Sequence, residues 1–237
     1  MNNNSWIIWN TLVKTDYKIT YITINVNYIP NVIYRNSLEI KIKFENHDMI
    51  EKFSNLVFKQ YGIDIRFNIY DNSFDIELKN SNPTHMLDNK NILECLLFPP
   101  DVDCIEIVVL SNQSFFSDTP HIKLLNLSEN LHQLKIYSQF ISFDLSNLPT
   151  DIILLDVSEC ESKLNLDYLP WGLKILNLPN IKQRNFNNSY NLSDLSNLPL
   201  SLIQINVGHI VFKSIKDLIE TFDKKIKQQI ELNNKIN

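Results

Sequence analysis

Residues 144–157, with the sequence DLSNLPTDIILLDV, contain the pattern on which most of the chain is built. The first six residues, DLSNLP, return unchanged at residues 194–199. A phrase that returns with its apolar residues at fixed offsets is typical of an array of stacked units. Such arrays serve binding more often than catalysis, so the pattern indicates how the protein works without naming its target.

Five rows share this pattern, which reads apolar-Pro-x-x-apolar-x-x-apolar-x-apolar. They begin at residues 98, 127, 148, 169 and 198, with spacings of 29, 21, 21 and 29 residues, and only Ser128 replaces the proline. The apolar-x-apolar end of each row predicts a short strand with two inward residues. Proline cannot donate to a strand ladder, so it predicts the end of the segment that precedes each strand. Because no row can bury its apolar face alone, we expect the rows to stack.

The rows resemble leucine-rich repeats, in the short Leu-Pro form of about 21 residues. Cys160 occupies the position where that family usually has Asn or Cys, whereas Leu110, Gln139, Ile181 and Ile210 occupy it in the other rows. A weaker resemblance, based on Leu-Pro-x-x-Leu and Phe186-Asn187, is to the FNIP repeats of slime moulds and amoeba-infecting giant viruses. The leucine-rich resemblance covers about residues 95–212 and implies a repeat solenoid there.

The first 85 residues predict a different, α+β unit. Residues 5–13 and 17–28 are rich in strand-forming residues, and Leu38 to Phe44 alternate strictly between apolar and charged. A helix is expected from Asn46, as its N-cap, to Gly62, as its C-terminal cap. Strict alternation over residues 63–69 and 74–78, with a turn at Asp71-Asn72, predicts a β-hairpin that packs on this helix.

The C-terminal residues predict a helix that covers the last row. Ser214-Ile215-Lys216-Asp217 resembles a capping box, and an apolar stripe runs from Ile215 to Ile230. A partner-binding amphipathic helix is the alternative. With a boundary in the polar stretch 80–90, we expect an N-terminal α+β unit at 1–85, a leucine-rich-repeat array at 86–212, and a capping helix and tail at 213–237. The expected fold class is therefore α+β: a small antiparallel sheet with a helix, followed by a helix-capped solenoid.

Composition narrows the setting and the class of partner. With 44% hydrophobic and 21% charged residues and a net charge of −5, the chain reads as a globular protein that does not bind nucleic acid nonspecifically. No apolar run is long enough to span a membrane. Three scattered cysteines suit a reducing compartment. We therefore expect a cytoplasmic protein. Frequent Asn and Ile suggest the AT-rich genome of an organism or virus, and a viral protein is expected in the host cytoplasm or the virion.

The sequence contains no recognisable catalytic or metal-binding motif. The five histidines are scattered, Cys95 and Cys104 have no zinc spacing, and a chain with 3 glycines is poorly suited to a phosphate loop. Asp101, Asp103 and Glu106 are more often solvated turn residues than cation ligands. We therefore predict a non-enzymatic protein with no metal and no cofactor; an unrecognised catalytic site in the N-terminal unit is the alternative.

The candidate binding residues are the strand residues that point away from the core. Leu154 and Ile175 are apolar neighbours among them, and an apolar centre with a polar rim is how a protein-binding hot spot is built. The alternative is that inserts or the N-terminal unit cover these two side chains. The full candidate set, with Cys104 beside it, is Glu106, Gln133, Lys135, Tyr137, Leu154, Asp156, Ile175, Asn177, Gln204 and Asn206.

The sequence thus predicts a protein–protein interaction module that uses the inner strand face of its repeat array. Two alternatives stay open: a structural or virion-packaged scaffold protein of a large AT-rich virus, and a substrate adaptor of a ubiquitin ligase. The expected partner is a protein of unknown identity, with no nucleic acid and no membrane, and self-association stays open as well.

Overall fold

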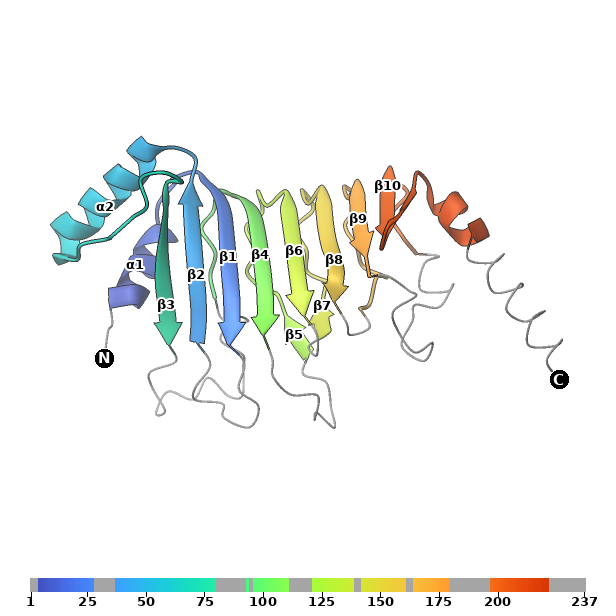
Figure 1. The fold of residues 1–237 in the computed structure, drawn as a ribbon, viewed down its shortest axis with the longest axis horizontal. Coiled ribbons are helices and arrows are strands. Elements are labelled where there is room, and N and C mark those ends of the chain that lie inside the picture. Colours follow the sequence, from blue (N-terminus) through green and yellow to red (C-terminus); the bar gives the residue numbers. More distant parts are fainter. Residues whose placement is uncertain are drawn as a thin grey trace.

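The chain folds around one large mixed β-sheet in the computed structural model, which describes residues 4–27, 37–79, 93, 96–110, 121–138, 142–160, 164–179 and 197–221. The sheet has nine strands in the order β11-β10-β9-β8-β6-β4-β1-β2-β3 (Figure 1). Its strands are β1 (Ile19–Asn27), β2 (Ser37–Phe44), β3 (Ser73–Lys79), β4 (Val102–Leu110), β6 (Gln133–Ser138), β8 (Leu154–Cys160), β9 (Ile175–Leu178), β10 (Gln204–Val207) and β11 (Ile210–Phe212).

The remaining described elements are few. Helices α1 (Asn4–Leu12) and α2 (His47–Tyr61) lie at the β3 end of the sheet (Figure 1). Strands β5 (His121–Lys123) and β7 (Ser142–Asp144) pair in parallel as a second, two-stranded sheet, and residues 215–221 are helical. None of the described helices is both long enough and apolar enough to cross a membrane.

The expected fold, a small antiparallel unit followed by a repeat solenoid, is wrong. β1 pairs with β4 in parallel along its whole length, from Ile19 beside Val102 to Asn27 beside Leu110. The antiparallel pairs β1–β2 and β2–β3 therefore continue directly into the parallel strands β4, β6, β8, β9 and β10 as one mixed sheet. The division of the chain near residue 85 stays a prediction, because the stretch 80–92 lies outside the described residues.

The predicted strand at residues 5–13 is also wrong, because these residues form α1. Ile8, Trp9 and Leu12 are buried, and Leu12 follows the other two by four and three residues, which places all three on one side of a helix. The Trp9 indole Nε1 donates a hydrogen bond to the Leu97 carbonyl (3.0 Å), and the ring meets Phe98 edge-on. Tertiary contacts with residues about 90 positions away thus override the local preference for strand.

The predicted helix 46–62 is confirmed in detail. The Asn46 side chain accepts a hydrogen bond from the Met49 amide (3.1 Å), and Gly62 adopts the left-handed conformation (φ 68°) at the other end. α2 buries Phe53 against Phe44 and Phe74, with ring centroids 5.7 and 5.8 Å apart. This aromatic cluster fixes α2 to the buried face of β2 and β3.

The predicted hairpin is half wrong. The Asp71-Asn72 turn and the strand after it, β3, are present, and Asn72 carries the positive φ (53°) that a short polar side chain tolerates. Residues 63–67, however, form no strand, and only an isolated bridge joins Asn68 to Ser73. β3 instead pairs with β2, which offers a partner already packed on the core.

The five predicted row strands are confirmed, and so is their alignment. β4, β6, β8, β9 and β10 run parallel, and Ile105, Leu134, Leu155, Leu176 and Ile205 form one continuous buried line across them. The second inward residue of each row is buried as well. Cys160, at the position where leucine-rich repeats usually have Asn or Cys, is buried, and its Sγ donates to the Ile136 carbonyl (3.2 Å).

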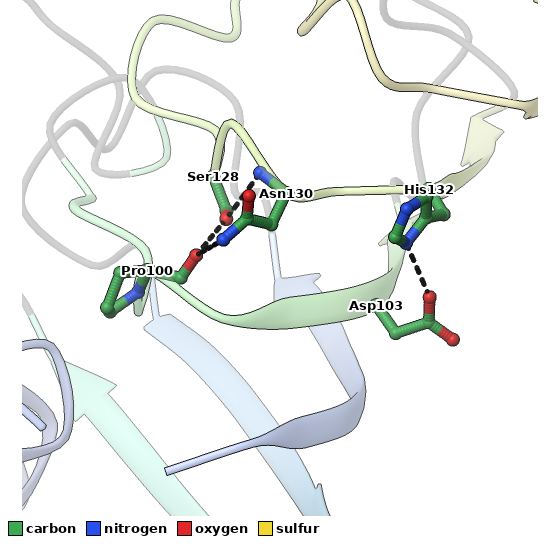
Figure 2. Close-up of polar contacts among 5 residues, drawn as sticks. All are labelled: Pro100, Asp103, Ser128, Asn130 and His132. Atoms are coloured by element: carbon green, nitrogen blue, oxygen red, sulfur yellow. Dashed lines mark hydrogen bonds and ion pairs between the residues drawn. The ribbon is translucent and has the colours of Figure 1, made fainter. Parts of the chain in front are cut away.

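The row without a proline is held by side-chain hydrogen bonds instead (Figure 2). The Ser128 hydroxyl donates to the Pro100 carbonyl (2.6 Å) and accepts from the Asn130 amide (3.2 Å). Asn130 Nδ2 also donates to the Pro100 carbonyl (3.2 Å). On the strand side of this junction, His132 Nδ1 lies 2.9 Å from Asp103 Oδ1 (Figure 2). Three of these contacts, from Ser128, Asn130 Nδ2 and His132, thus join the first row to the second where the repeat proline is missing.

One of the two hydrogen bonds of the predicted C-terminal capping box is present: the Ser214 hydroxyl accepts from the Asp217 amide (3.1 Å). Leu218 is buried and Ile215 packs on the core, as the expected apolar stripe requires. The rest of that stripe, from Phe222 to Ile230, lies outside the described residues.

Candidate functional site

The face of the sheet opposite the buried core carries all the candidate residues, and we call it the open face. Apolar side chains of α1 and α2 and of the β5–β7 sheet join the core on the other side, for example Trp9, Phe53 and Phe143. On the open face, the side chains of β1, β4, β6, β8, β9 and β10 are mostly half-buried, and those of β2 and β3 are mostly exposed. This surface therefore presents side chains to solvent across these eight strands.

Strand register arranges the ten candidates in three levels. The first level contains Gln133, Leu154, Ile175 and Gln204 side by side, and the second contains Glu106, Lys135, Asp156, Asn177 and Asn206. Tyr137 lies at the third level, two residues beyond Lys135 on β6. All ten are half-buried. The structure thus brings every candidate together on one continuous surface.

Four of these side chains are satisfied by one another in what we call the amide ladder: Gln204, Asn206, Asn177 and Asp156. Gln204 Nε2 donates to Asn206 Oδ1 (3.1 Å), and Asn206 Nδ2 donates to Asn177 Oδ1 (2.6 Å). Asn177 Nδ2 donates in turn to Asp156 Oδ2 (2.8 Å). Every donor points toward the carboxylate, so the bonds polarise one another in the same direction.

The other oxygen of Asp156 is also occupied. Asp156 Oδ1 accepts from the Ser158 amide (3.0 Å) and from the Ser158 hydroxyl (2.7 Å). The carboxylate therefore has three donors from its own chain. We infer that the amide ladder stiffens the face between β8 and β10 and leaves little hydrogen-bonding capacity there for a ligand.

A second group joins β1, β4 and β6. The Tyr21 hydroxyl donates to Glu106 Oε2, and Lys135 Nζ lies over the Tyr21 ring, 5.7 Å from its centroid. A cation over an aromatic face is attracted by the ring quadrupole. Lys135 therefore leans across β4 toward β1, and away from the β8 side of its own strand.

Between these two groups lie side chains with unused polar atoms. Within the described ranges, neither the Gln133 amide nor the Tyr137 hydroxyl has a hydrogen-bond partner, and Glu159 has no ion pair. Tyr137 and Glu159 are paired across β6 and β8. Burial raises the pKa of Tyr137, and the nearby carboxylates of Glu106 and Asp156 raise it further. Tyr137 thus presents a neutral hydroxyl in an acidic setting.

Leu154 and Ile175 lie side by side at the first level, between Gln133 and Gln204. Both are half-buried, so the described part of the chain covers them only in part. An apolar pair flanked by two amides is a contact area from which a partner can displace water.

Cys104, in contrast, is not a candidate for chemistry. Its side chain is buried, and burial raises the pKa of the thiol to about 11. The thiol is therefore protonated at neutral pH and a poor nucleophile. Within the described ranges, no group of three or more His, Cys, Asp or Glu side chains could hold a metal ion.

Sequence reasoning missed two residues of this surface. Tyr21 lies on β1. The sequence predicted β1 as a strand but did not show that β1 pairs with β4. Glu159 was missed because the two-residue period of a regular strand places Ser158, and not Glu159, on the same face as Asp156. A register shift between β6 and β8 sets Glu159 opposite Tyr137. Only the paired backbone shows either position.

A separate apolar edge is exposed where the parallel strands begin. Trp171 is 80% exposed and Leu200 85%, and they occupy the same place in consecutive rows, directly after the proline. The Ser201 hydroxyl donates to the Leu173 carbonyl (2.6 Å), which ties the two turns together. This edge lies off the open face and provides matched control positions.

Comparisons with models of protein families, with curated proteins and with solved structures found no match to this chain.

Proposed function

We propose that this chain is a non-enzymatic protein-binding module whose open face, at β4 to β10, contacts a partner protein. The observation that carries the proposal is the half-buried Leu154–Ile175 pair, which lies between a self-satisfied amide ladder and side chains with unused polar atoms. In the same proposal, the rows keep their likeness to Leu-Pro leucine-rich repeats, whose strand residues carry recognition.

The physical support is that different side chains on this face stabilise the surface and contact the partner. The amide ladder holds β8, β9 and β10 in place, so little order has to be created on binding. Gln133 then offers hydrogen bonds beside the apolar pair, and Tyr137 offers its hydroxyl four residues further along β6. Fixed side chains around an apolar pair lower the entropic cost of association, which is how a binding surface gains affinity without a deep pocket.

The test is affinity purification from the native source with matched variants. The wild-type chain is compared with Leu154→Asp and Ile175→Asp, and with Leu200→Asp as a control at an exposed apolar position off the open face. We expect a stoichiometric foreign protein with the wild type and with Leu200→Asp, and its loss with both open-face variants. Circular dichroism of each variant checks that the fold is intact.

Two results would refute the proposal. If the foreign protein still copurifies with Leu154→Asp and Ile175→Asp, the open face is not the binding surface. If only copies of this chain are recovered, and ultracentrifugation of the purified protein shows self-association that depends on these residues, a scaffold role replaces the binding role.

A further inference from the structure

Tyr137 and Glu159 lie on the open face, further along β6 and β8 than the apolar pair Leu154 and Ile175. They are directly opposite one another on β6 and β8. Glu159 is exposed and Tyr137 half-buried. Neither the carboxylate of Glu159 nor the hydroxyl of Tyr137 is bonded to any other described side chain.

The charges around Tyr137 are mainly negative. Glu106, Asp156 and Glu159 all act on it electrostatically, and Lys135 is the one cation that opposes them among the described residues. The Lys135 ammonium lies over the Tyr21 ring on the β1 side. The hydrogen bonds that Asp156 accepts leave its negative charge in place. The surroundings of Tyr137 therefore attract a further cation.

An aromatic ring beside a carboxylate suits a guanidinium or ammonium group. The ring face attracts the cation through its quadrupole, and the carboxylate accepts charge-assisted hydrogen bonds from it. Arg fits better than Lys, because its planar group can stack on the ring while its edge reaches the carboxylate. An acidic partner side chain would gain neither contact, and a neutral donor would gain only the hydrogen bond to the carboxylate.

We propose that the partner inserts a basic side chain, Arg in preference to Lys, at Tyr137 and Glu159, while an apolar side chain of the same extended segment packs on Leu154 and Ile175. This inference rests on the proposed function of the open face and names the chemistry of its partner.

Strand geometry sets the spacing in that segment. Leu154 is level with Gln133 on β6, and Tyr137 lies four residues further along the same strand. At about 3.3 Å per residue this separation is about 13 Å. An extended segment that runs along β6 and β8 therefore presents its apolar and basic side chains about four residues apart.

The experiment is a selection of phage-displayed random 12-residue peptides on the full chain, with counter-selection on the Leu154→Asp variant. The counter-selection runs in parallel with a selection that omits it, and the peptides enriched without it are the ones compared on wild type and Leu154→Asp. We expect these peptides to carry Arg or Lys about four residues from a large apolar residue. Glu159→Gln is expected to weaken the enriched peptides at least tenfold, and Tyr137→Leu likewise, whereas Glu129→Gln, at an exposed acid off the open face, leaves binding unchanged.

The outcomes separate this inference from the proposed function. Peptides that depend on Leu154 but lack a basic residue, or that bind Glu159→Gln as well as the wild type, overturn the inference and leave the open face as the binding surface. If the enriched peptides bind wild type and Leu154→Asp equally, the proposed function fails. If no peptide is enriched, the result counts against both.

Discussion

Replacing Asn177 by Ala tests whether the amide ladder holds the open face in shape. Asn177 is the central member: its Nδ2 donates to Asp156 (2.8 Å), and its Oδ1 accepts from Asn206 (2.6 Å). The alanine removes both bonds at once. Asp156 then loses a donor and Asn206 loses an acceptor in a half-buried setting.

The magnitude follows from these two bonds. A neutral hydrogen bond contributes about 0.5–1.5 kcal/mol to stability, and one to a charged group about 1.5–3 kcal/mol. Because the ladder is only half-buried, water can replace part of each bond, and we take the lower ends. The expected loss in the free energy of unfolding is about 2 kcal/mol, or a fall of about 0.7–1 M in the urea midpoint at an m-value of about 2–3 kcal/mol/M.

The substitution Asn177→Asp sharpens the test through its pH dependence. It places a carboxylate beside that of Asp156, and two like charges at this distance favour protonation of one of them. One carboxyl of the pair then holds its proton at higher pH in the folded than in the unfolded chain. The repulsion is therefore present at neutral pH and is lost as the pH falls through that raised value. Asn177→Asp should be less stable than Asn177→Ala at pH 7 and approach it near pH 4.

Urea unfolding followed by tryptophan fluorescence measures these differences. The control is Asn197→Ala, which removes an Asn-to-Asp hydrogen bond of similar length (Asn197 Nδ2 to Asp167 Oδ1, 3.0 Å) in an exposed turn. We expect the control to lose less than about 0.5 kcal/mol, as is usual for exposed polar pairs. If Asn177→Ala loses no more than the control, or Asn177→Asp shows no pH dependence relative to Asn177→Ala, the amide ladder does not stabilise the face.

Three further predictions concern the scaffold. Gly172→Ala should lower the free energy of unfolding by about 1–3 kcal/mol, because the added Cβ would lie 2.6 Å from the Thr150 carbonyl oxygen, and Gly172→Asn should be no better. At Gly62, where φ is 68° and the space is open, Asn should cost less stability than Ala. If Ala and Asn behave alike at the two sites in urea unfolding, the close approach at Gly172 is contradicted. Ser128→Ala should lower the free energy of unfolding by about 1–2 kcal/mol, because it removes the hydrogen bonds of the hydroxyl. Ser128→Pro should lower it less, because proline occupies this position in the other four rows and restricts the unfolded chain. The reverse order in thermal unfolding would contradict the alignment of the rows. Iodoacetamide should alkylate Cys104 in the folded chain at pH 8 about a hundredfold more slowly than in urea, because burial raises the pKa of the thiol to about 11. The alkylation rate in the folded chain should rise about tenfold per pH unit up to about pH 11. Peptide mapping that finds rapid labelling at pH 8 would refute the raised thiol pKa.

The sequence predicted the parts of the fold that follow from local periodicity. The two-residue period within each row and the proline before it specify both a strand and its inward face, so Leu155 and Leu176 could be aligned without a structure. The same alignment placed Leu154 beside Ile175 and Asp156 beside Asn177 on the open face. α2 was predictable for a similar reason, since its caps are single residues at its own ends.

Pairing between distant segments could not be read from the sequence. The alternation in β1 shows that Tyr21 and Ile22 face opposite ways, but not that β4 lies at its second edge. The helix α1 is stabilised by contacts with Leu97 and Phe98, far along the chain. Its residues, taken locally, favour a strand, and the prediction of a strand there was therefore wrong. Glu159 depends on a register shift that no alignment of rows contains.

The central claim, that the open face binds the partner, is tested most directly by hydroxyl-radical footprinting of the complex. The partner recovered by affinity purification is added to the purified chain, and oxidation of each side chain is compared with and without it. We predict protection of Leu154, Ile175 and Tyr137, with Trp171 and Leu200 oxidised as in the free chain. Protection of Trp171 and Leu200, with Leu154 and Ile175 unchanged, would contradict the account and move the binding surface to the apolar edge.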